Sequence, residues 1–181
     1  IAELRRHAGG VPVMALGRIG DPHEAEAVLA RGQADLIGLG RALIADPAWP
    51  EKAFSGRGHA IRPCLTCNTC WATIAEGADL ACANNPALAT EEEISAPRVI
   101  RRDRKRLVVV GGGVAGLEAA WVAAARGHEV VLFGASSEVG GRARLAAALP
   151  GGAELAGVFD YQWAAAREHG VQLELSTKAE I

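Results

Sequence analysis

The stretch VPVMALGRIGDPHEAEAVLARGQADLIGLGRALIADP, residues 11–47, decides the fold class of this chain. Residues 11–16 and 34–39 are short apolar runs typical of buried strands, and a Gly-Arg turn follows each of them. An Asp-Pro pair between them starts a helix that we expect over residues 21–31. Strands and helices that alternate across such short loops predict a parallel α/β fold.

The two Gly-Arg turns are candidates for a phosphate site. In barrels of alternating strands and helices, the last two strand ends often hold a phosphate, which glycine amides and a helix N-terminus approach closely. The alternative is that the glycines only make tight turns and that the arginines are solvated. The candidate residues are Gly17, Arg18, Gly38, Gly40 and Arg41.

All four cysteines of the chain lie in one run, CLTCNTCWATIAEGADLAC, residues 64–82. Cys64, Cys67 and Cys70 are spaced three residues apart, and Cys82 follows after a gap of eleven residues. Three thiolates on one loop and a fourth from farther along are typical of the ligands of a [4Fe–4S] cluster. Zinc, which more often uses two separated cysteine pairs or histidine, and free thiols are the alternatives. A disulfide framework is not expected, and reduced thiols fit a cytoplasmic protein.

A second α/β motif begins with LVVVGGGVAG, residues 107–116. An apolar strand enters a G-x-G-x-x-G turn, and a helix over 117–126 and a strand over 130–133 are expected to follow. In this context the glycines let backbone amides approach a pyrophosphate at the helix N-terminus, so the motif predicts dinucleotide or ADP binding. The alternative is a purely structural turn. The glycines of the motif are Gly111, Gly113 and Gly116.

One residue that usually accompanies this motif is missing. An acidic side chain normally follows the second strand and binds the ribose hydroxyls. Here that position is Gly134, while Glu129 lies at the opposite end of the expected strand. We therefore expect the phosphate cradle to be kept, and the ribose contact to be weakened, altered or supplied by a neighbour such as Ser136.

Residues 11–56 resemble the seventh and eighth strand–helix units of the Old Yellow Enzyme family of flavin barrels. The continuation IRPCLTCNTC, residues 61–70, resembles the iron–sulfur branch of that family, which includes 2,4-dienoyl-CoA reductase, trimethylamine dehydrogenase and histamine dehydrogenase. The resemblance covers essentially the whole chain. It implies that the five Gly-Arg residues hold the phosphate of FMN and that the four cysteines hold the cluster. It also implies that the Gly140-Gly141-Arg142 turn approaches the second cofactor.

Motifs and resemblance together predict an α/β chain in three parts. Residues 1–58 would be the C-terminal part of a (β/α)8 TIM barrel, and residues 59–103 an iron–sulfur segment with a linker. Residues 104–181 would be the start of a Rossmann-like FAD/NAD(P)-binding domain. The chain begins without Met, inside an expected helix, so we expect it to be a piece of a longer protein.

The resemblance implies an NADH:flavin oxidoreductase-type enzyme that passes electrons between FMN, the cluster and a second nucleotide cofactor. In a reductase, NAD(P)H would supply electrons through FAD to reduce an activated alkene. In an amine dehydrogenase, the second unit would hold ADP, and a protein acceptor such as an electron-transfer flavoprotein would take the electrons. The spacing of the first three cysteines resembles the amine dehydrogenases, whereas the gap to Cys82 resembles the reductases. A truncated polypeptide without activity of its own is the third alternative, because the family's substrate-contacting residues lie on earlier strands.

Composition agrees with a soluble globular protein, with 50% hydrophobic residues and a net charge of −2. No apolar run has the length of a membrane span, and no basic cluster predicts a nucleic-acid partner. We expect a small-molecule substrate, and a homo-oligomer is compatible with these features. Arg62 either tunes the cluster or lies on the surface. The four tryptophans are expected to be packing residues: Trp49, Trp71, Trp121 and Trp163.

Overall fold

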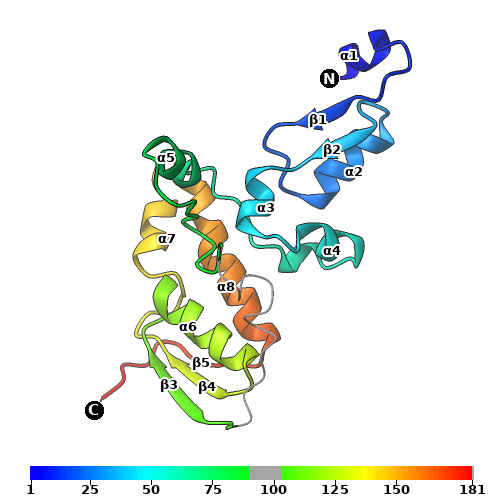
Figure 1. Cartoon of the computed structure of the whole chain (residues 1–181). Coiled ribbons are helices and arrows are strands. Elements are labelled where there is room, and N and C mark those ends of the chain that lie inside the picture. Colours follow the sequence, from blue (N-terminus) through cyan, green and yellow to red (C-terminus); the bar gives the residue numbers. More distant parts are fainter. Residues whose placement is uncertain (90–102, 181) are drawn as a thin grey trace. The chain divides into compact units, whose positions relative to one another are not determined.

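The computed structural model describes residues 1–89 and 103–180 (Figure 1). The chain forms two compact units that divide between Asn85 and Pro86, and the cysteine run belongs to the first of them. The predicted boundaries at residues 58 and 103 stay predictions. Most of the expected linker lies outside the described residues, including its acidic run at 91–93 and the start of the basic run at 101–106.

The first unit contains the strand–helix–strand–helix order that the sequence predicts. Strand β1 (Met14–Leu16) pairs in parallel with β2 (Leu36–Gly38), and α2 (Pro22–Ala30) connects them. The strands are shorter than the apolar runs that contain them, because each has one pairing partner among the described residues. The other elements of this unit are α1 (Ala2–His7), α3 (Arg41–Ala45), α4 (Trp49–Phe54), the 3-10 turn η1 (Gly58–Ala60) and α5 (Thr69–Ala75).

Local signals in the sequence set the helix boundaries of this unit. The Asp21 carboxylate accepts a hydrogen bond from the His23 backbone N–H at 2.6 Å and so caps α2, as predicted. Gly32, with φ +62°, ends the same helix. Helix α3 stops at Ala45, and α4 begins at Trp49, so Asp46 and Pro47 separate the two helices.

The first unit has a small core. Ala25, Ala42, Trp49 and Ile61 are buried together. In contrast, the side chains of Leu16 and Leu36 on the two strands are 66% and 50% exposed. Trp71 on α5 is 64% exposed, so the prediction that it is a packing residue is wrong. This core buries much less apolar area than a closed barrel of strands would bury.

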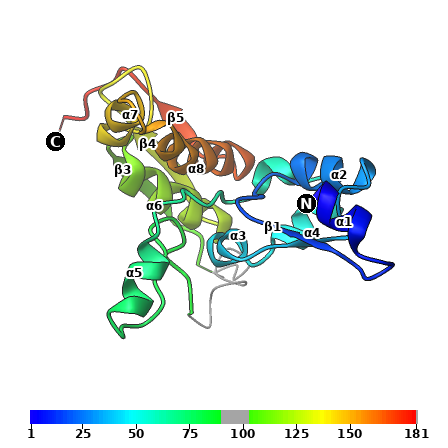
Figure 2. The ribbon, with the colours of Figure 1, turned by 90° about the horizontal axis from the view of Figure 1, so that it is seen from above.

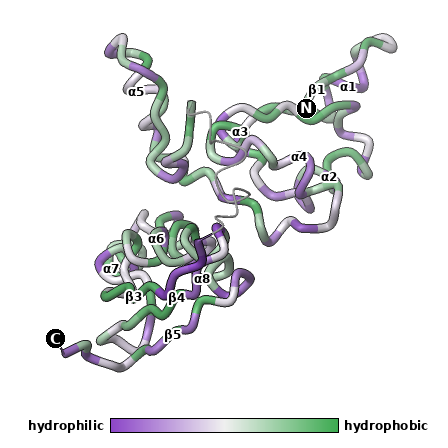
Figure 3. The backbone as a smooth tube through the Cα atoms, turned by 60° about the horizontal axis from the view of Figure 1, so that its bottom comes forward, coloured by the Kyte–Doolittle hydropathy of each residue, from purple (hydrophilic) through white to green (hydrophobic). Residues whose placement is uncertain are grey.

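The second unit is a parallel three-stranded sheet with helices packed on it, as its sequence predicts. The strands are β3 (Arg106–Val110), β4 (Glu129–Phe133) and β5 (Gln172–Glu174), in the order β3-β4-β5. Helix α6 (Val114–Ala125) packs on β3 and β4, and α8 (Ala156–Glu168) lies beside α6 (Figure 2). The green colour along β3 and β4 in Figure 3 marks their apolar sequence. Leu117 on α6 and Leu132 on β4 are fully buried at the centre of the core.

Two helices were not expected from the sequence. Helix α5 starts inside the cysteine motif, and α7 (Arg142–Ala147) starts directly after Gly141. Both short helices follow a residue with positive φ, Asn68 and Gly141, so the chain reverses before each of them. Helix α6 also begins three residues before the expected start at Leu117, because Gly113 of the glycine turn is its N-cap residue. Within the described residues, no helix has the length and apolarity needed to cross a membrane.

Candidate functional site

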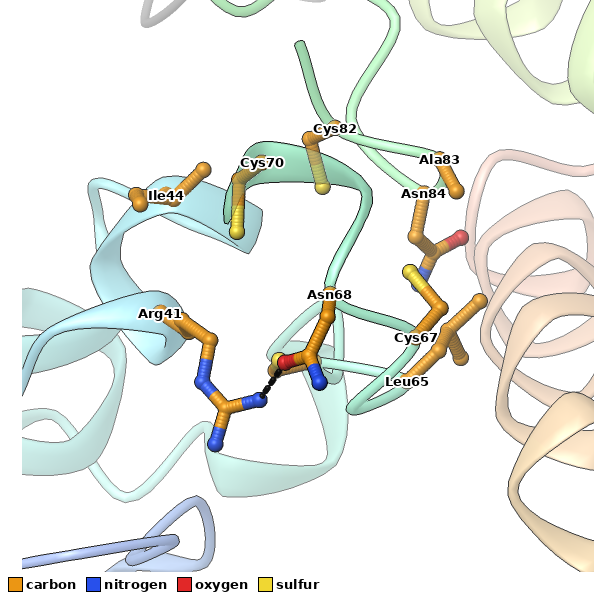
Figure 4. A pocket seen from close by; sticks show the side chains of 10 residues that line it. Arg41, Ile44, Leu65, Cys67, Asn68, Cys70, Cys82, Ala83 and Asn84 are labelled. Atoms are coloured by element: carbon orange, nitrogen blue, oxygen red, sulfur yellow. Dashed lines mark hydrogen bonds between the residues drawn. The ribbon is translucent and has the colours of Figure 1, made fainter. Parts of the chain in front are cut away.

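The four cysteines of the first unit line a single pocket (Figure 4). The pocket has an empty volume of about 290 Å³, part of it open to solvent. Cys70 is buried, Cys64 and Cys82 are half-buried and Cys67 is exposed, so the thiols surround the pocket at different depths. The lining residues are Arg41, Ile44, Cys64, Leu65, Cys67, Asn68, Cys70, Cys82, Ala83 and Asn84.

Two left-handed residues shape the loop that carries the first three cysteines. Thr66 has φ +53° and Asn68 has φ +61°, conformations that few residues except glycine and asparagine adopt readily. The Asn68 carbonyl then accepts hydrogen bonds from the N–H groups of Trp71 and Ala72, both at 3.0 Å, and starts α5. The loop therefore reverses direction between Cys64 and Cys70, and Cys70 enters the pocket wall from the first turn of a helix.

Arg62 joins the two ends of the cysteine run. Its guanidinium donates a hydrogen bond to the backbone carbonyl of Asn84, and the Asn84 side-chain amide donates to the Pro63 carbonyl at 2.8 Å. These contacts hold the segment after Cys82 against the segment before Cys64, which closes the gap of eleven residues. Arg62 is 8% exposed, so the alternative that it is a surface arginine is wrong.

Asp46 fixes the same segment to the strand–helix unit. Its carboxylate is 5% exposed and accepts hydrogen bonds from the Ala48 N–H at 3.1 Å, the Lys52 ammonium at 2.6 Å and the Arg62 N–H at 2.8 Å. One buried side chain thus sets the α3–α4 break and the entry to the cysteine loop. The sequence marked Asp46 only as a helix end, because nothing in the local pattern announces a partner sixteen residues away.

Replacing Asp46 by Ala should destabilise the first unit strongly. The change leaves the Lys52 ammonium and the Arg62 N–H without their acceptor in a buried place, which typically costs about 3–5 kcal/mol. Urea denaturation measures the loss of unfolding free energy. The matched control is Asp35→Ala, which removes an exposed pair with Arg5 and an exposed acceptor of the Val13 N–H, and should cost much less than Asp46→Ala. Equal losses in the two variants would contradict the role given to Asp46.

The environment of Cys67 favours its thiolate. Partial burial raises the pKa of the Cys67 thiol, but hydrogen bonds from Thr69 and from its own backbone outweigh that effect. The Thr69 hydroxyl lies 3.3 Å from the Cys67 sulfur. With the positive charge of Arg41 added, the pKa of Cys67 is lowered from its ordinary value. Thiolate is the form in which cysteine binds metals.

The thiols are spread around the pocket rather than gathered at one point. Among residues 1–89 and 103–180, no three Cys, His, Asp or Glu side chains are grouped as ligands of one metal ion. The ten lining residues include one permanent charge, the guanidinium of Arg41, whose Nη1 donates a hydrogen bond to Asn68 Oδ1 at 2.6 Å. Neither this bond nor Asn68 was singled out from the sequence.

The two Gly-Arg turns lie at the same edge of the β1–β2 sheet. Leu16 and Gly38 are register partners in the parallel pair, so the chain leaves both strands side by side. Gly17 and Arg18 have φ +119° and +58°, which make the first turn sharp. At Gly38 an added Cβ would lie 2.4 Å from a Leu16 methyl group, so this glycine has a packing reason independent of any phosphate.

In the second unit, the glycine motif forms one continuous turn. An added Cβ at Gly116 would lie 1.9 Å from the Gly111 carbonyl oxygen, so this glycine lets α6 pack directly on the end of β3. Gly113 has no heavy atom within 4 Å of an added Cβ and faces open space. The backbone N–H of Gly140 donates to the Gly112 carbonyl at 2.8 Å. This bond brings the Gly140-Gly141-Arg142 turn against the glycine motif, and the approach of this turn to a second cofactor stays a prediction.

Gly134 lies directly after β4, beside the glycine turn. An added Cβ would lie 3.8 Å from the Gly112 backbone nitrogen and 2.9 Å from a Leu175 methyl group. Its N–H donates to the Glu174 carbonyl at 2.9 Å, so the backbone continues the sheet for one residue. The predicted end of the second strand is confirmed. Glu129 starts that strand, at the opposite end from the turn.

Comparison with known proteins identifies both units. Residues 2–59 match the NADH:flavin oxidoreductase / NADH oxidase family, and residues 109–174 match the NAD(P)-binding Rossmann-like domain. An NADH oxidase of Thermoanaerobacter brockii is 37% identical over 185 residues, with 99% of this chain and 28% of that protein covered.

Two solved structures resemble almost the whole chain. A 2-naphthoyl-CoA reductase in complex with 2-naphthoyl-CoA has a TM-score of 0.90 at 31% identity, and the match covers 98% of this chain and 27% of that one. A histamine dehydrogenase from Rhizobium sp. 4-9 has a TM-score of 0.88 at 30% identity, and the match covers 96% and 26% of the two chains. This chain thus spans about a quarter of the length of the proteins it matches, and it belongs to the NADH:flavin oxidoreductase / NADH oxidase family.

Proposed function

We propose that the four cysteines hold a [4Fe–4S] cluster in an oxidoreductase that also carries FMN and a second nucleotide cofactor. The observation that carries this proposal is that all four thiols line one pocket, although eleven residues separate Cys70 from Cys82. Because this chain spans about a quarter of its relatives, the activity belongs to the whole protein. When bound, such a cluster supplies one-electron transfer between the other cofactors.

The spacing of the cysteines favours a cluster over a single zinc ion, because three of them share one loop and the fourth comes from farther along the chain. Four sulfurs at about 2.3 Å from one zinc ion lie no more than about 4.6 Å from one another. In a cubane cluster each thiolate binds a different iron, so the ligands stand farther apart around a larger group. Four thiols that line one pocket of about 290 Å³ are compatible with the second case.

FMN is assigned to the two Gly-Arg turns of the first unit. They lie within the residues that match the flavin oxidoreductase family, and they leave the sheet at one edge. A phosphate at that edge would meet backbone amides of Gly17 and Gly40 and the charges of Arg18 and Arg41. The exposed strand residues Leu16 and Leu36 are the surface that the remaining strands of a (β/α)8 barrel would cover.

For the reaction, we propose NAD(P)H-dependent reduction of an activated alkene. In support, the structurally similar 2-naphthoyl-CoA reductase acts on an aromatic acyl-CoA thioester according to its name, and the eleven-residue gap before Cys82 resembles the reductases. Oxidation of an amine, with electrons passed to a protein acceptor, is the second candidate. It is favoured by the spacing of Cys64, Cys67 and Cys70 and by the similarity to histamine dehydrogenase.

Metal and flavin analysis of the full-length protein, purified without oxygen, tests the proposal. We expect close to four irons and four acid-labile sulfides per chain, bound FMN, and an EPR signal that appears on reduction. Stoichiometric zinc in place of iron would overturn it. Rapid reduction of the bound flavin by NAD(P)H, followed by oxidation with an enoyl thioester, supports the alkene reductase. Reduction by amines alone supports the dehydrogenase.

Replacing Gly134 by Asp should tighten nucleotide binding in the second unit. The carboxylate would supply a charge-assisted hydrogen bond to the ribose, worth roughly 1.5–3 kcal/mol, or about tenfold to a hundredfold in Kd. Gly134 does not have positive φ, so Asp is compatible with its backbone once the Leu175 methyl group turns aside. The effect should be larger for NADH and FAD than for NADPH, whose 2′-phosphate the carboxylate repels.

Gly134→Ala is the control for this experiment, because it meets the same Leu175 methyl group without a carboxylate. It should leave the affinities for NADH, NADPH and FAD at or below those of the unchanged protein. If Asp and Ala give the same three affinities in parallel titrations, Gly134 does not face the ribose.

A further inference from the structure

The contact between Arg41 and Asn68 links the two candidate sites of the first unit. Arg41 is the first residue of α3, directly after the second Gly-Arg turn, and Asn68 stands between two cysteines. The 2.6 Å hydrogen bond from Arg41 Nη1 to Asn68 Oδ1 holds the guanidinium against the cysteine loop (Figure 4). Both side chains line the pocket that all four thiols surround.

Asn68 is suited to this contact by its backbone as well as its side chain. Its φ of +61° lies in the left-handed region, where asparagine and glycine are the residues most easily accommodated. Its carbonyl starts α5, so the backbone of the same residue sets the position of Cys70. Because these features fix the backbone of Asn68, its side-chain oxygen is well placed to accept the hydrogen bond from the Arg41 guanidinium.

The positive charge of Arg41 would affect electron transfer by the proposed cluster. Four thiolates and a cluster form an anionic group, and the reduced cluster carries one further electron. The guanidinium of Arg41 brings a permanent positive charge to the pocket. Net charge and hydrogen bonds around the sulfurs are the protein's means of setting a cluster potential.

We propose that Asn68 is a positioning residue that holds the Arg41 guanidinium beside the cluster and thereby raises its reduction potential. This inference rests on the proposed cluster and adds to it a role for two residues of this chain. One Nη1–H of Arg41 is used by Asn68, and a guanidinium has further N–H groups that can donate to a phosphate at the Gly-Arg turn. The same arginine thus connects the flavin side of the unit to the cysteine side.

A redox titration of the full-length protein, followed by EPR, tests the inference. Arg41→Gln should lower the cluster potential by about 28–59 mV, a threefold to tenfold change in the one-electron equilibrium constant. Asn68→Gly, which keeps the left-handed backbone and removes the acceptor, should lower it in the same direction by a smaller amount. Asn68→Asp, which keeps the hold on Arg41 but offsets its charge, should also lower the potential.

A double variant separates positioning from general disturbance of the loop. In the Arg41→Gln background, Asn68→Gly should add no further shift, because Asn68 acts through the guanidinium. Arg57→Gln is the matched control, since Arg57 is an exposed arginine of the same unit that pairs with Glu51 and does not line the pocket. It should leave the potential unchanged.

Each outcome of this experiment is decisive. Equal potentials in the unchanged protein and all the variants, with four irons in each, would overturn the inference and leave the proposed cluster standing. Loss of iron from Asn68→Gly would show that the amide serves only to build the loop, and would also overturn it. Absence of iron from the unchanged protein would overturn the proposed function itself, and the inference with it.

Discussion

Replacing Cys70 by Ala should remove the proposed [4Fe–4S] cluster and leave the proposed FMN site occupied. Cys70 is the most buried of the four thiols and enters the pocket from the first turn of α5. Without Cys70, one iron of the cluster loses its protein ligand, and only three thiolates remain to bind the other irons. We expect less than a tenth of the iron of the unchanged protein and no EPR signal on reduction. FMN should stay because the residues that match the flavin family, 2–59, end before the first cysteine.

Two further variants make this result specific. Cys70→Ser keeps a small polar side chain and should also lose most of the iron, since an alcohol is a poor substitute for a thiolate. Trp71→Phe changes the neighbouring residue, which is 64% exposed, and should keep the cluster complete. If Cys70→Ala retained four irons, Cys70 would not be a ligand. If FMN were lost together with the iron, the two sites would depend on each other.

Replacing Gly116 by Ala should disrupt the second unit, whereas replacing Gly113 by Ala should impair only its binding. The added Cβ at Gly116 would stand 1.9 Å from a backbone carbonyl oxygen, and that oxygen belongs to the turn and has no rotamer to change. Helix α6, which carries the fully buried Leu117, has to move away from the sheet. We expect a loss of about 2–4 kcal/mol in unfolding free energy, after the small gain that Ala brings to a helix.

Gly113 provides the matched comparison in the same motif. Its φ of −81° suits any residue, and an added Cβ meets no heavy atom within 4 Å. Stability should therefore change by about 0.5 kcal/mol or less. A methyl group there stands in the open space before the helix N-terminus, where the pyrophosphate is expected, so nucleotide affinity should fall about tenfold or more. Urea denaturation and titration with NADH measure the two effects. Equal stability losses would contradict the assignment of packing to Gly116 and binding to Gly113.

The glycine motif shows how far the sequence alone can predict this protein. Its spacing, preceded by an apolar strand and followed by a helix, was enough to place a parallel sheet and a tight glycine turn at the start of a helix, because close backbone approach admits only glycine. Asp21 and Gly32 likewise marked the ends of α2, since capping acts within a few residues of the chain. The spacing of the cysteines pointed to one shared site. Signals of this kind are local, so the sequence expresses them directly.

The contacts that assemble the cysteine pocket were decided by the tertiary structure. Arg41 meets Asn68 across 27 residues, and Arg62 meets Asn84 across 22. Asp46 binds the Arg62 N–H from a separate helix end, and Arg62 proved to be buried. Hydrogen bonds between residues far apart in the sequence depend on how the chain folds between them. No periodicity or motif in the sequence predicts that folding. The sequence by itself determined which residue types are present for the chemistry, whereas the fold decided which charge stands beside the thiols and which side chains hold it there.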